Sequence, residues 1–160
     1  MGPGQRGFSI IEILIVVTII AIIAAIAVPR LVDASQDARE SALGTDLQML
    51  RRQIRLYTEQ HNTRGPHLDE NGNPDTPNLV ARMLGRTDPK GKLTTTGGFG
   101  PYMKTWPTNP YCAAAVASDI KFGTNAVPPR DGTSGWYYST ETCIVSPNSK
   151  TGGMEYDPPG

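Results

Sequence analysis

An uninterrupted apolar run near the start of the sequence constrains the fold more than any other feature. From Ile13 to Val28 the only polar side chain is Thr18. Including Phe8 to Glu12 extends this mostly apolar stretch to 21 residues. As a helix rising about 1.5 Å per residue, it spans roughly 30 Å, which is the thickness of the hydrocarbon in a bilayer. The run therefore predicts a helix able to cross a membrane.

Three interpretations of this run compete: a buried core helix, a cleaved secretory signal and a retained membrane anchor. A core helix is disfavoured because the run has no polar stripe. A secretory signal is favoured by the basic Arg6 and by the A-x-A pattern Ala25-Ile26-Ala27. Glu12 argues against such a signal, because a carboxylate opposes insertion and a discarded segment has no use for it.

Charge is balanced along the chain, and this excludes two classes of partner. The sequence holds 15 Lys+Arg and 15 Asp+Glu, and no third of it carries a cluster of one sign. A nucleic-acid-binding surface and a polybasic membrane arm both require clustered Lys and Arg. We therefore expect no nucleic-acid partner.

The motif at the head of the apolar run resembles a known signal. Gly7-Phe8-Ser9-Ile10-Ile11-Glu12, followed by the run and Pro29, is similar to the class III signal of type IV pilins and of the pseudopilins of type II secretion. The resemblance implies that a prepilin peptidase cuts between Gly7 and Phe8 and methylates the new N-terminal Phe8. The hydrophobic helix is then retained.

Glu12 has a physical role under this interpretation. Cleavage creates an α-amino group at Phe8, and Glu12 of a neighbouring subunit could pair with it during assembly. Each charge alone in lipid is costly, and the pair offsets that cost only when subunits meet. The alternative is that Glu12 reaches the lipid headgroups of its own leaflet.

Helical patterning resumes after Pro29, where we expect a kink or local melting. A stripe with 4-3-4-3-4 spacing predicts a face buried on a core: Leu43, Leu47, Leu50, Ile54, Tyr57 and His61. A second stripe lies about 120° away: Leu31, Ala34, Ala38, Ala42, Met49 and Leu56. The second stripe either admits other helices of a filament or is a weakly apolar solvent face. The helix should end near Asn62, before Gly65-Pro66.

The residues from Gly65 onward predict a folded, loop-rich head. They hold 25 of the 31 Gly and Pro residues and nine of the eleven aromatic residues. A disordered tail lacks such apolar mass. Gly100 to Tyr111 contains three prolines and three aromatic residues, which predicts an extended packed segment. This segment also resembles the loop before the sheet in major pseudopilins.

Short elements are expected within the head. The sequence predicts one helix at Asn78–Leu84 and strands at Ile120–Phe122, Gly135–Tyr138 and Cys143–Val145. Ser139–Thr142 is the expected hairpin loop between the last two strands. The fold class is therefore α+β, a long N-terminal α-helix packed on a small antiparallel β-sheet head, as in pilins. The expected organisation has four parts: leader 1–7, transmembrane and polymerisation helix 8–29, amphipathic helix 30–62 and head 63–160.

The head offers weak signals for metal binding. Four side chains alternate like the start of a calcium loop: Asp69, Asn71, Asn73 and Asp75. Pro74 and Val80 stand where an EF-hand needs Gly and Glu, so a turn is expected. The resemblance to major pseudopilins makes calcium the only candidate cofactor, and the tail offers just Glu155 and Asp157 to bind it.

Cys112 and Cys143 would lie in an oxidising compartment if the anchor is retained. A disulfide between them is then expected, and two free buried thiols are the alternative. His61 and His67 lack motif spacing with these cysteines, so the case for zinc is weak and structural roles are expected for both histidines.

No nucleophile, phosphate-loop or metalloprotease motif is present, so we do not expect an enzyme. The resemblance implies a filament subunit, most like the major pseudopilin of a type II secretion system, which polymerises to push secreted proteins outward. The alternatives are a type IVa pilin, serving adhesion, motility or DNA uptake, and a secreted or anchored binding module with an ordinary signal peptide.

The resemblance also implies partners and a location. The partners are further copies of the chain, prepilin peptidase, an inner-membrane platform protein, a cytoplasmic assembly ATPase, minor pilins or pseudopilins, and membrane lipid. The expected location is the bacterial inner membrane, crossed once with the head in the periplasm, and an extracytoplasmic filament.

Overall fold

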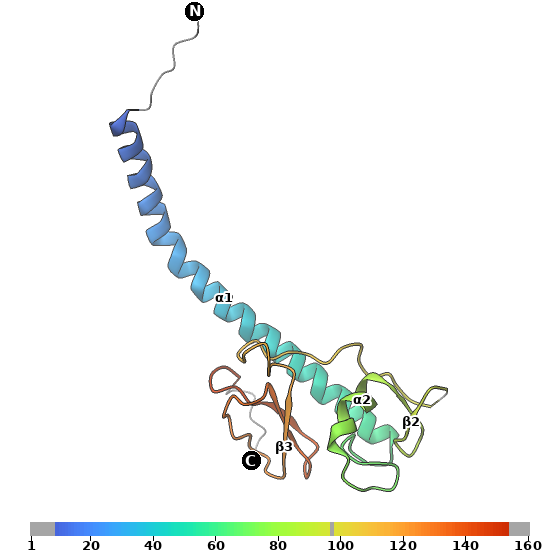
Figure 1. The fold of residues 1–160 in the computed structure, drawn as a ribbon. Helices are drawn as coiled ribbons and strands as arrows, with labels where there is room; N and C mark the ends of the chain where they lie inside the picture. Colours follow the sequence, from blue (N-terminus) through green and yellow to red (C-terminus); the bar gives the residue numbers. More distant parts are fainter. Residues whose placement is uncertain (1–8, 97, 154–160) are drawn as a thin grey trace, which may run out of the picture. The chain divides into compact units, whose positions relative to one another are not determined.

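A computed structural model describes residues 9–96 and 98–153. Its longest element is the helix α1, Ile10–Gln60 (Figure 1). The helix continues through Pro29, and the kink predicted there stays a prediction. The chain divides into two compact units, the first ending at Ala38 and the second beginning at Arg39.

The end of α1 follows from its backbone. Asn62 and Thr63 both adopt the left-handed conformation, with φ of 55° and 63°. The amide of Thr63 donates to the carbonyl of Thr58 at 2.9 Å, which satisfies one of the last carbonyls of the helix. The helix therefore ends at Gln60, close to the predicted position.

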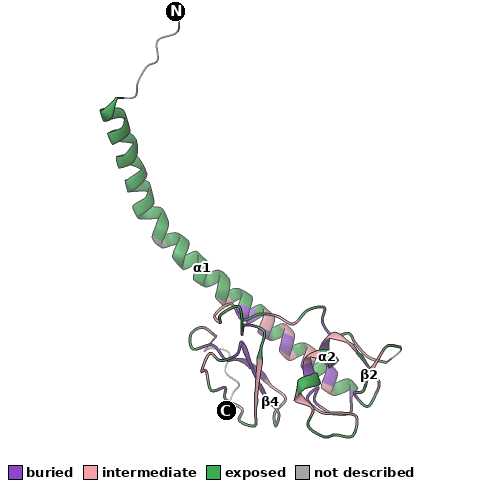
Figure 2. Ribbon diagram, in the orientation of Figure 1, coloured by how far each residue is buried: buried purple, intermediate pink, exposed green. Residues whose placement is uncertain are grey.

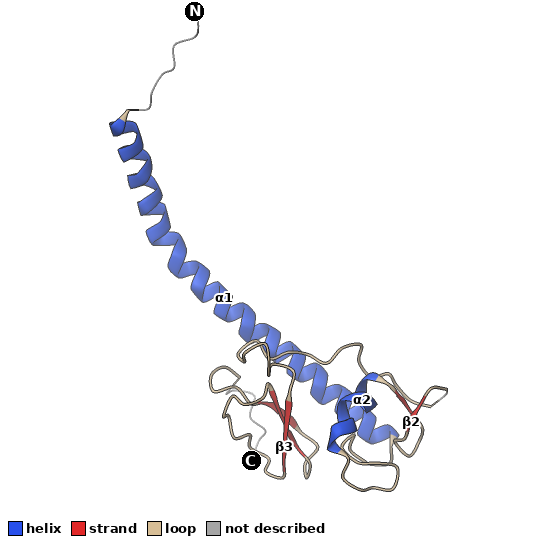
Figure 3. Cartoon of the chain, viewed as in Figure 1, coloured by secondary structure: helices blue, strands red, loops and turns tan. Residues whose placement is uncertain are grey.

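The second unit carries the short elements of the head (Figure 3). They are the 3₁₀-helix η1 Thr76–Asn78, the helix α2 Leu79–Leu84 and the strands β1 Arg86–Thr87, β2 Leu93–Thr94, β3 Ile120–Gly123, β4 Trp136–Ser139 and β5 Val145–Pro147. The predicted helix and the three predicted strands are thus present, shifted by one or two residues. β1 and β2 form an antiparallel pair that was not predicted from the sequence.

The three-stranded sheet has the order β3-β4-β5. β4 and β5 are antiparallel, with Tyr138 opposite Val145. β3 pairs with β4 in parallel, with Ile120 opposite Trp136, so the sheet is mixed and not wholly antiparallel as expected. The reason is the connection: residues 124–135 return the chain to the start of β4, as a parallel pair requires.

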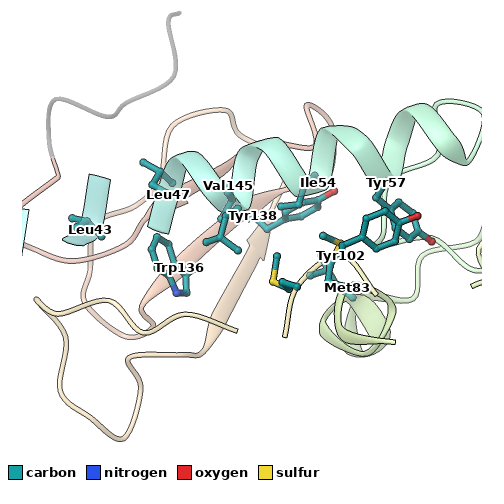
Figure 4. Close-up of a cluster of buried hydrophobic side chains, with 12 residues drawn as sticks. Leu43, Leu47, Ile54, Tyr57, Met83, Tyr102, Trp136, Tyr138 and Val145 are labelled. Carbon is teal, nitrogen blue, oxygen red and sulfur yellow. The ribbon is translucent and has the colours of Figure 1, made fainter. Parts of the chain in front are cut away.

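The core of the head lies between α1 and the sheet. All six residues of the first stripe are buried, as predicted: Leu43, Leu47, Leu50, Ile54, Tyr57 and His61. Figure 4 shows members of this stripe facing Trp136, Tyr138 and Val145 from the sheet and Met83 from α2. The part of α1 that belongs to the second unit therefore packs on the rest of the head through one continuous apolar face.

The loop from Gly100 to Tyr111 packs on this core. The amides of Tyr102 and Met103 both donate to the carbonyl of Met83, at 3.0 and 3.2 Å. The indole of Trp136 donates to the carbonyl of Pro107 at 3.0 Å. The segment is extended and packed, as its prolines and aromatic residues predict.

Candidate functional site

The first unit presents a long apolar surface. Its large apolar side chains from Ile10 to Val32 are between 51% and 90% exposed (Figure 2, green). Within the described residues, α1 is the one helix long and apolar enough to cross a membrane, by length and composition. Each such side chain left in water forgoes about 2 kcal/mol of burial free energy, so this surface needs lipid or protein around it.

The one polar side chain of the apolar run is compatible with such surroundings. The Thr18 hydroxyl donates to the carbonyls of Leu14 and Ile15, at 2.6 and 2.9 Å. Its hydrogen-bonding needs are therefore met within the helix, which hydrocarbon surroundings require.

Glu12 is exposed in the first turn of α1. Its amide donates to the carbonyl of Ser9 at 3.1 Å, so the residue belongs to the helix start. The partial positive charge of a helix N-terminus favours a carboxylate at this position. Five residues singled out in the sequence lie outside the described residues: Arg6, Gly7, Phe8, Glu155 and Asp157. The pairing of Glu12 with the amine of Phe8 therefore stays a prediction.

The second stripe of α1 is uncovered in the described residues. Leu31 is 72% exposed and Leu56 is 39% exposed. Ala34, Ala38 and Ala42 are also exposed, and Met49 is half-buried. Both interpretations of this stripe, a packing face for other helices and a solvent face, agree with its exposure.

The predicted disulfide is absent, because Cys112 and Cys143 are free thiols. The Cys112 thiol donates to the carbonyl of Ser134, just before β4. Cys143 lies in the loop after β4, where the amide of Ser139 donates to the carbonyl of Ile144. Since strand residues are about 3.3 Å apart, the two cysteines lie at opposite ends of β4 and beyond the Cα separation of a disulfide.

The loop that resembles the start of a calcium site uses its carboxylates internally. Asp69 accepts the amide of Asn73 at 2.7 Å. Asp75 accepts the side-chain amide of Asn78 and pairs with Arg82. The pKa of Asp69 is lowered chiefly by the Asn73 amide, and that of Asp75 by Asn78 and then by Arg82. These oxygens are satisfied by the chain itself, so the loop does not fit a calcium ion.

Both histidines are buried structural residues, as expected. The ring of His61 stacks on Tyr57 with centroids 3.9 Å apart and has Nε2 2.9 Å from the hydroxyl of Thr87. His67 has Nδ1 3.0 Å from the hydroxyl of Tyr138. No group of three or more His, Cys, Asp or Glu that could hold a metal occurs in residues 9–96 and 98–153.

A hollow on the head, like the β1–β2 pair, was not predicted from the sequence. It has a volume of about 420 Å³ and opens beside α1. Seven residues line it: Arg51, Ile54, Arg55, Thr58, Thr142, Cys143 and Ile144. Its sequence signal is the spacing of Arg51 and Arg55, one helical turn apart around the buried Ile54. That spacing does not stand out in the sequence, because this part of α1 carries basic and acidic residues in similar numbers.

Comparison with known proteins gives one match. Residues 2–28 match the family model of the prokaryotic N-terminal methylation motif. No curated protein and no solved structure matches the chain significantly. The matched residues contain Gly7, Phe8 and Glu12 together with the whole apolar run.

Proposed function

We propose that this chain is a structural subunit of a type IV pilus-like filament, anchored in the membrane by the first part of α1 before assembly. The methylation motif supports a type IV pilin-like subunit, with processing by a prepilin peptidase, membrane anchoring and an extracytoplasmic filament. Such subunits are structural and not enzymes. The observation that carries the proposal is that the matched segment includes a helix whose large apolar side chains are at least half exposed.

The exposed apolar side chains of α1 suit the helix both to a lipid bilayer and to the interior of a filament. In a monomer, lipid covers the side chains from Ile10 to Val32. In a filament, the corresponding helices of neighbouring subunits take the place of lipid. Assembly therefore exchanges one apolar environment for another and costs little burial free energy.

Glu12 supplies the direction of assembly in this proposal. The amine of a processed Phe8 and the carboxylate of Glu12 from a neighbour attract with roughly 4 kcal/mol at 4 Å separation and an effective dielectric constant of 20. In a monomer, no neighbouring subunit supplies either partner. The pair therefore favours addition of a subunit over sideways diffusion.

Substitution of Glu12 tests this mechanism. Glu12→Ala should leave the monomer processed and in the membrane but abolish filaments, because the amine of the neighbour loses its partner. Electron microscopy of sheared filaments, with immunoblots of membrane fractions, measures both. Glu59→Ala removes an exposed carboxylate elsewhere on α1 and is the matched control. A normal filament yield from Glu12→Ala would refute the pairing.

Among type IV pilin-like subunits, we propose the major pseudopilin of a type II secretion system, working with a platform protein, an assembly ATPase and minor pseudopilins. The packed Gly100 to Tyr111 segment supports this choice, because the loop before the sheet of major pseudopilins has a similar sequence. Deletion of the gene should then block protein secretion. Long retractable surface fibres with intact secretion would favour a type IVa pilin instead.

A further inference from the structure

We propose that the buried ion pair of Arg82 and Asp75 is an acid-sensitive switch, which holds three segments of the head together at neutral pH and releases them in acid. The segments are the loop 66–75, the helix α2 and the turn 88–92 between β1 and β2. All three belong to the second unit, and α2 and β2 lie near the end of α1 (Figure 1). The switch goes beyond the proposed function, because it needs no second subunit.

Arg82 is the buried cation of this region. It lies on α2 and is 3% exposed. Its Nε donates to the carbonyl of Gly91 at 3.0 Å, and its Nη1 donates to the carbonyls of Pro66 and Asp75, both at 3.2 Å. Arginine keeps its proton in proteins, so this positive charge is permanent. One guanidinium therefore holds α2 to both the loop and the turn.

The carboxylate of Asp75 compensates this buried charge. Its Oδ2 accepts a hydrogen bond from Nη2 of Arg82, and no other acidic side chain pairs with Arg82 in residues 9–96 and 98–153. Asn78 donates to both carboxylate oxygens, at 3.0 and 2.9 Å. A buried charge is tolerated while it is paired, and removal of one partner is strongly destabilising. Protonation of Asp75 therefore weakens the closed arrangement.

The other acidic groups around the ion pair do not replace Asp75. Asp69 and Asp88 each accept backbone amides within their own turns. Glu70 lies 4.0 Å from Lys92, and this pair is more exposed than Arg82 and Asp75. Exposed pairs of this kind contribute little to stability. The buried guanidinium thus depends on one carboxylate within the described residues.

The basic and aromatic groups that face the region add no negative charge in acid. Tyr57 of α1 is uncharged there, because burial is the main cause that raises its pKa to about 12. Arg64 donates to the carbonyl of Glu70 at 2.8 Å. His61 has Nε2 2.9 Å from the hydroxyl of Thr87. None of these groups offsets the loss of the Asp75 carboxylate.

His67 and Asp75 respond to acid with the same sign. Burial, and then Arg82, lowers the pKa of His67 in the folded chain. The pKa of Asp75 is lowered by Asn78 and then by Arg82. In a released loop, both groups return toward their ordinary pKa values of about 6.5 and 3.9. The released form therefore binds more protons, and release becomes easier as the pH falls below about 6.5 and again below about 4.

Hydrogen exchange of the full chain in detergent, followed by mass spectrometry, tests the switch region by region. The backbone hydrogen bonds of residues 66–92 protect their amides, as the Asp75 amide shows by donating to the carbonyl of His67 at 2.7 Å. After correction for intrinsic exchange rates, a change from pH 7 to 3.5 should lower protection at 66–92 about ten-fold. Protection of β4 and β5 should change less. Unchanged protection at 66–92, or an equal loss in the sheet, would overturn the inference.

Substitution of Asp75 separates the effect of its charge from other effects of acid. Asp75→Asn removes the negative charge at nearly constant size, so residues 66–92 should lose protection already at pH 7. Glu70→Gln is the matched control, because it removes a carboxylate of the same loop that makes no ion pair with Arg82 among the described residues. Wild-type protection of 66–92 in Asp75→Asn would contradict the switch. If Asp75→Asn does not fold, as loss of protection in β4 and β5 would reveal, the acid profile of the wild-type chain decides.

Discussion

His67 shows how a single buried side chain couples the head to pH. It is 6% exposed and packs against the ring of Tyr138. Burial, and then the nearby charge of Arg82, lowers the pKa of His67. In the unfolded chain the imidazole has its ordinary pKa of about 6.5. The unfolded state therefore binds more protons below this pH, and stability falls as the pH is lowered toward the pKa of the folded state.

Replacement of His67 should remove this dependence. Between pH 7.5 and 5, the melting temperature of the wild-type chain in detergent should fall more steeply than that of His67→Gln, which has no group to protonate there. Circular dichroism of the aromatic region follows the unfolding of the head. Parallel pH profiles for the two proteins would show that His67 titrates normally in the folded state.

At the scale of elements, α1 has two faces with different tasks. Leu47 belongs to the buried stripe and has no exposed surface, whereas Leu56 belongs to the second stripe and is 39% exposed. The first face is used within the chain. In the proposed filament, the second face is used between chains.

Substitution on each face should separate these tasks. Leu47→Ala should lower the free energy of unfolding by about 3 kcal/mol, because it removes buried methyl groups and leaves a cavity. Leu56→Ala should change that free energy little but reduce filament yield. Denaturation in detergent and electron microscopy measure the two effects. If Leu56→Ala lowered the stability but left the filament yield unchanged, the second stripe would pack within the head and not between subunits.

The elements differ in how far the sequence predicts them. The buried stripe of α1 was predicted residue by residue, because helix periodicity is local and covers many turns. β5 begins two residues later than expected, since Cys143 has φ of 57° and turns the chain there. β1 and β2 were missed because strands of two residues show no alternation.

The prediction of a disulfide was wrong because it was inferred only from the expected oxidising compartment. The positions of Cys112 and Cys143 depend instead on which end of β4 each loop meets, and no local sequence pattern specifies this. The parallel pairing of β3 likewise depends on the path of residues 124–135, which no local pattern specifies.

For the candidate site, Glu12 was identified from the sequence because its charge is unusual in an apolar run. The hollow beside Arg55 was not, because it forms only when the loop after β4 packs on α1.

At the scale of the whole molecule, the balance of charge is compatible with close packing of identical subunits. The chain carries 15 basic and 15 acidic residues. Identical subunits that stack closely would repel along a filament if each carried a large net charge. Balance removes this repulsion.

The central claim is that the apolar helix is kept after processing and begins at Phe8. Mass spectrometry of the protein purified from membranes of cells that contain the prepilin peptidase tests it most directly. We predict a mature chain of residues 8–160 with one methyl group on the amine of Phe8. A chain that begins at Val28, after Ala25-Ile26-Ala27, would contradict the claim, because the helix would then be a discarded secretory signal.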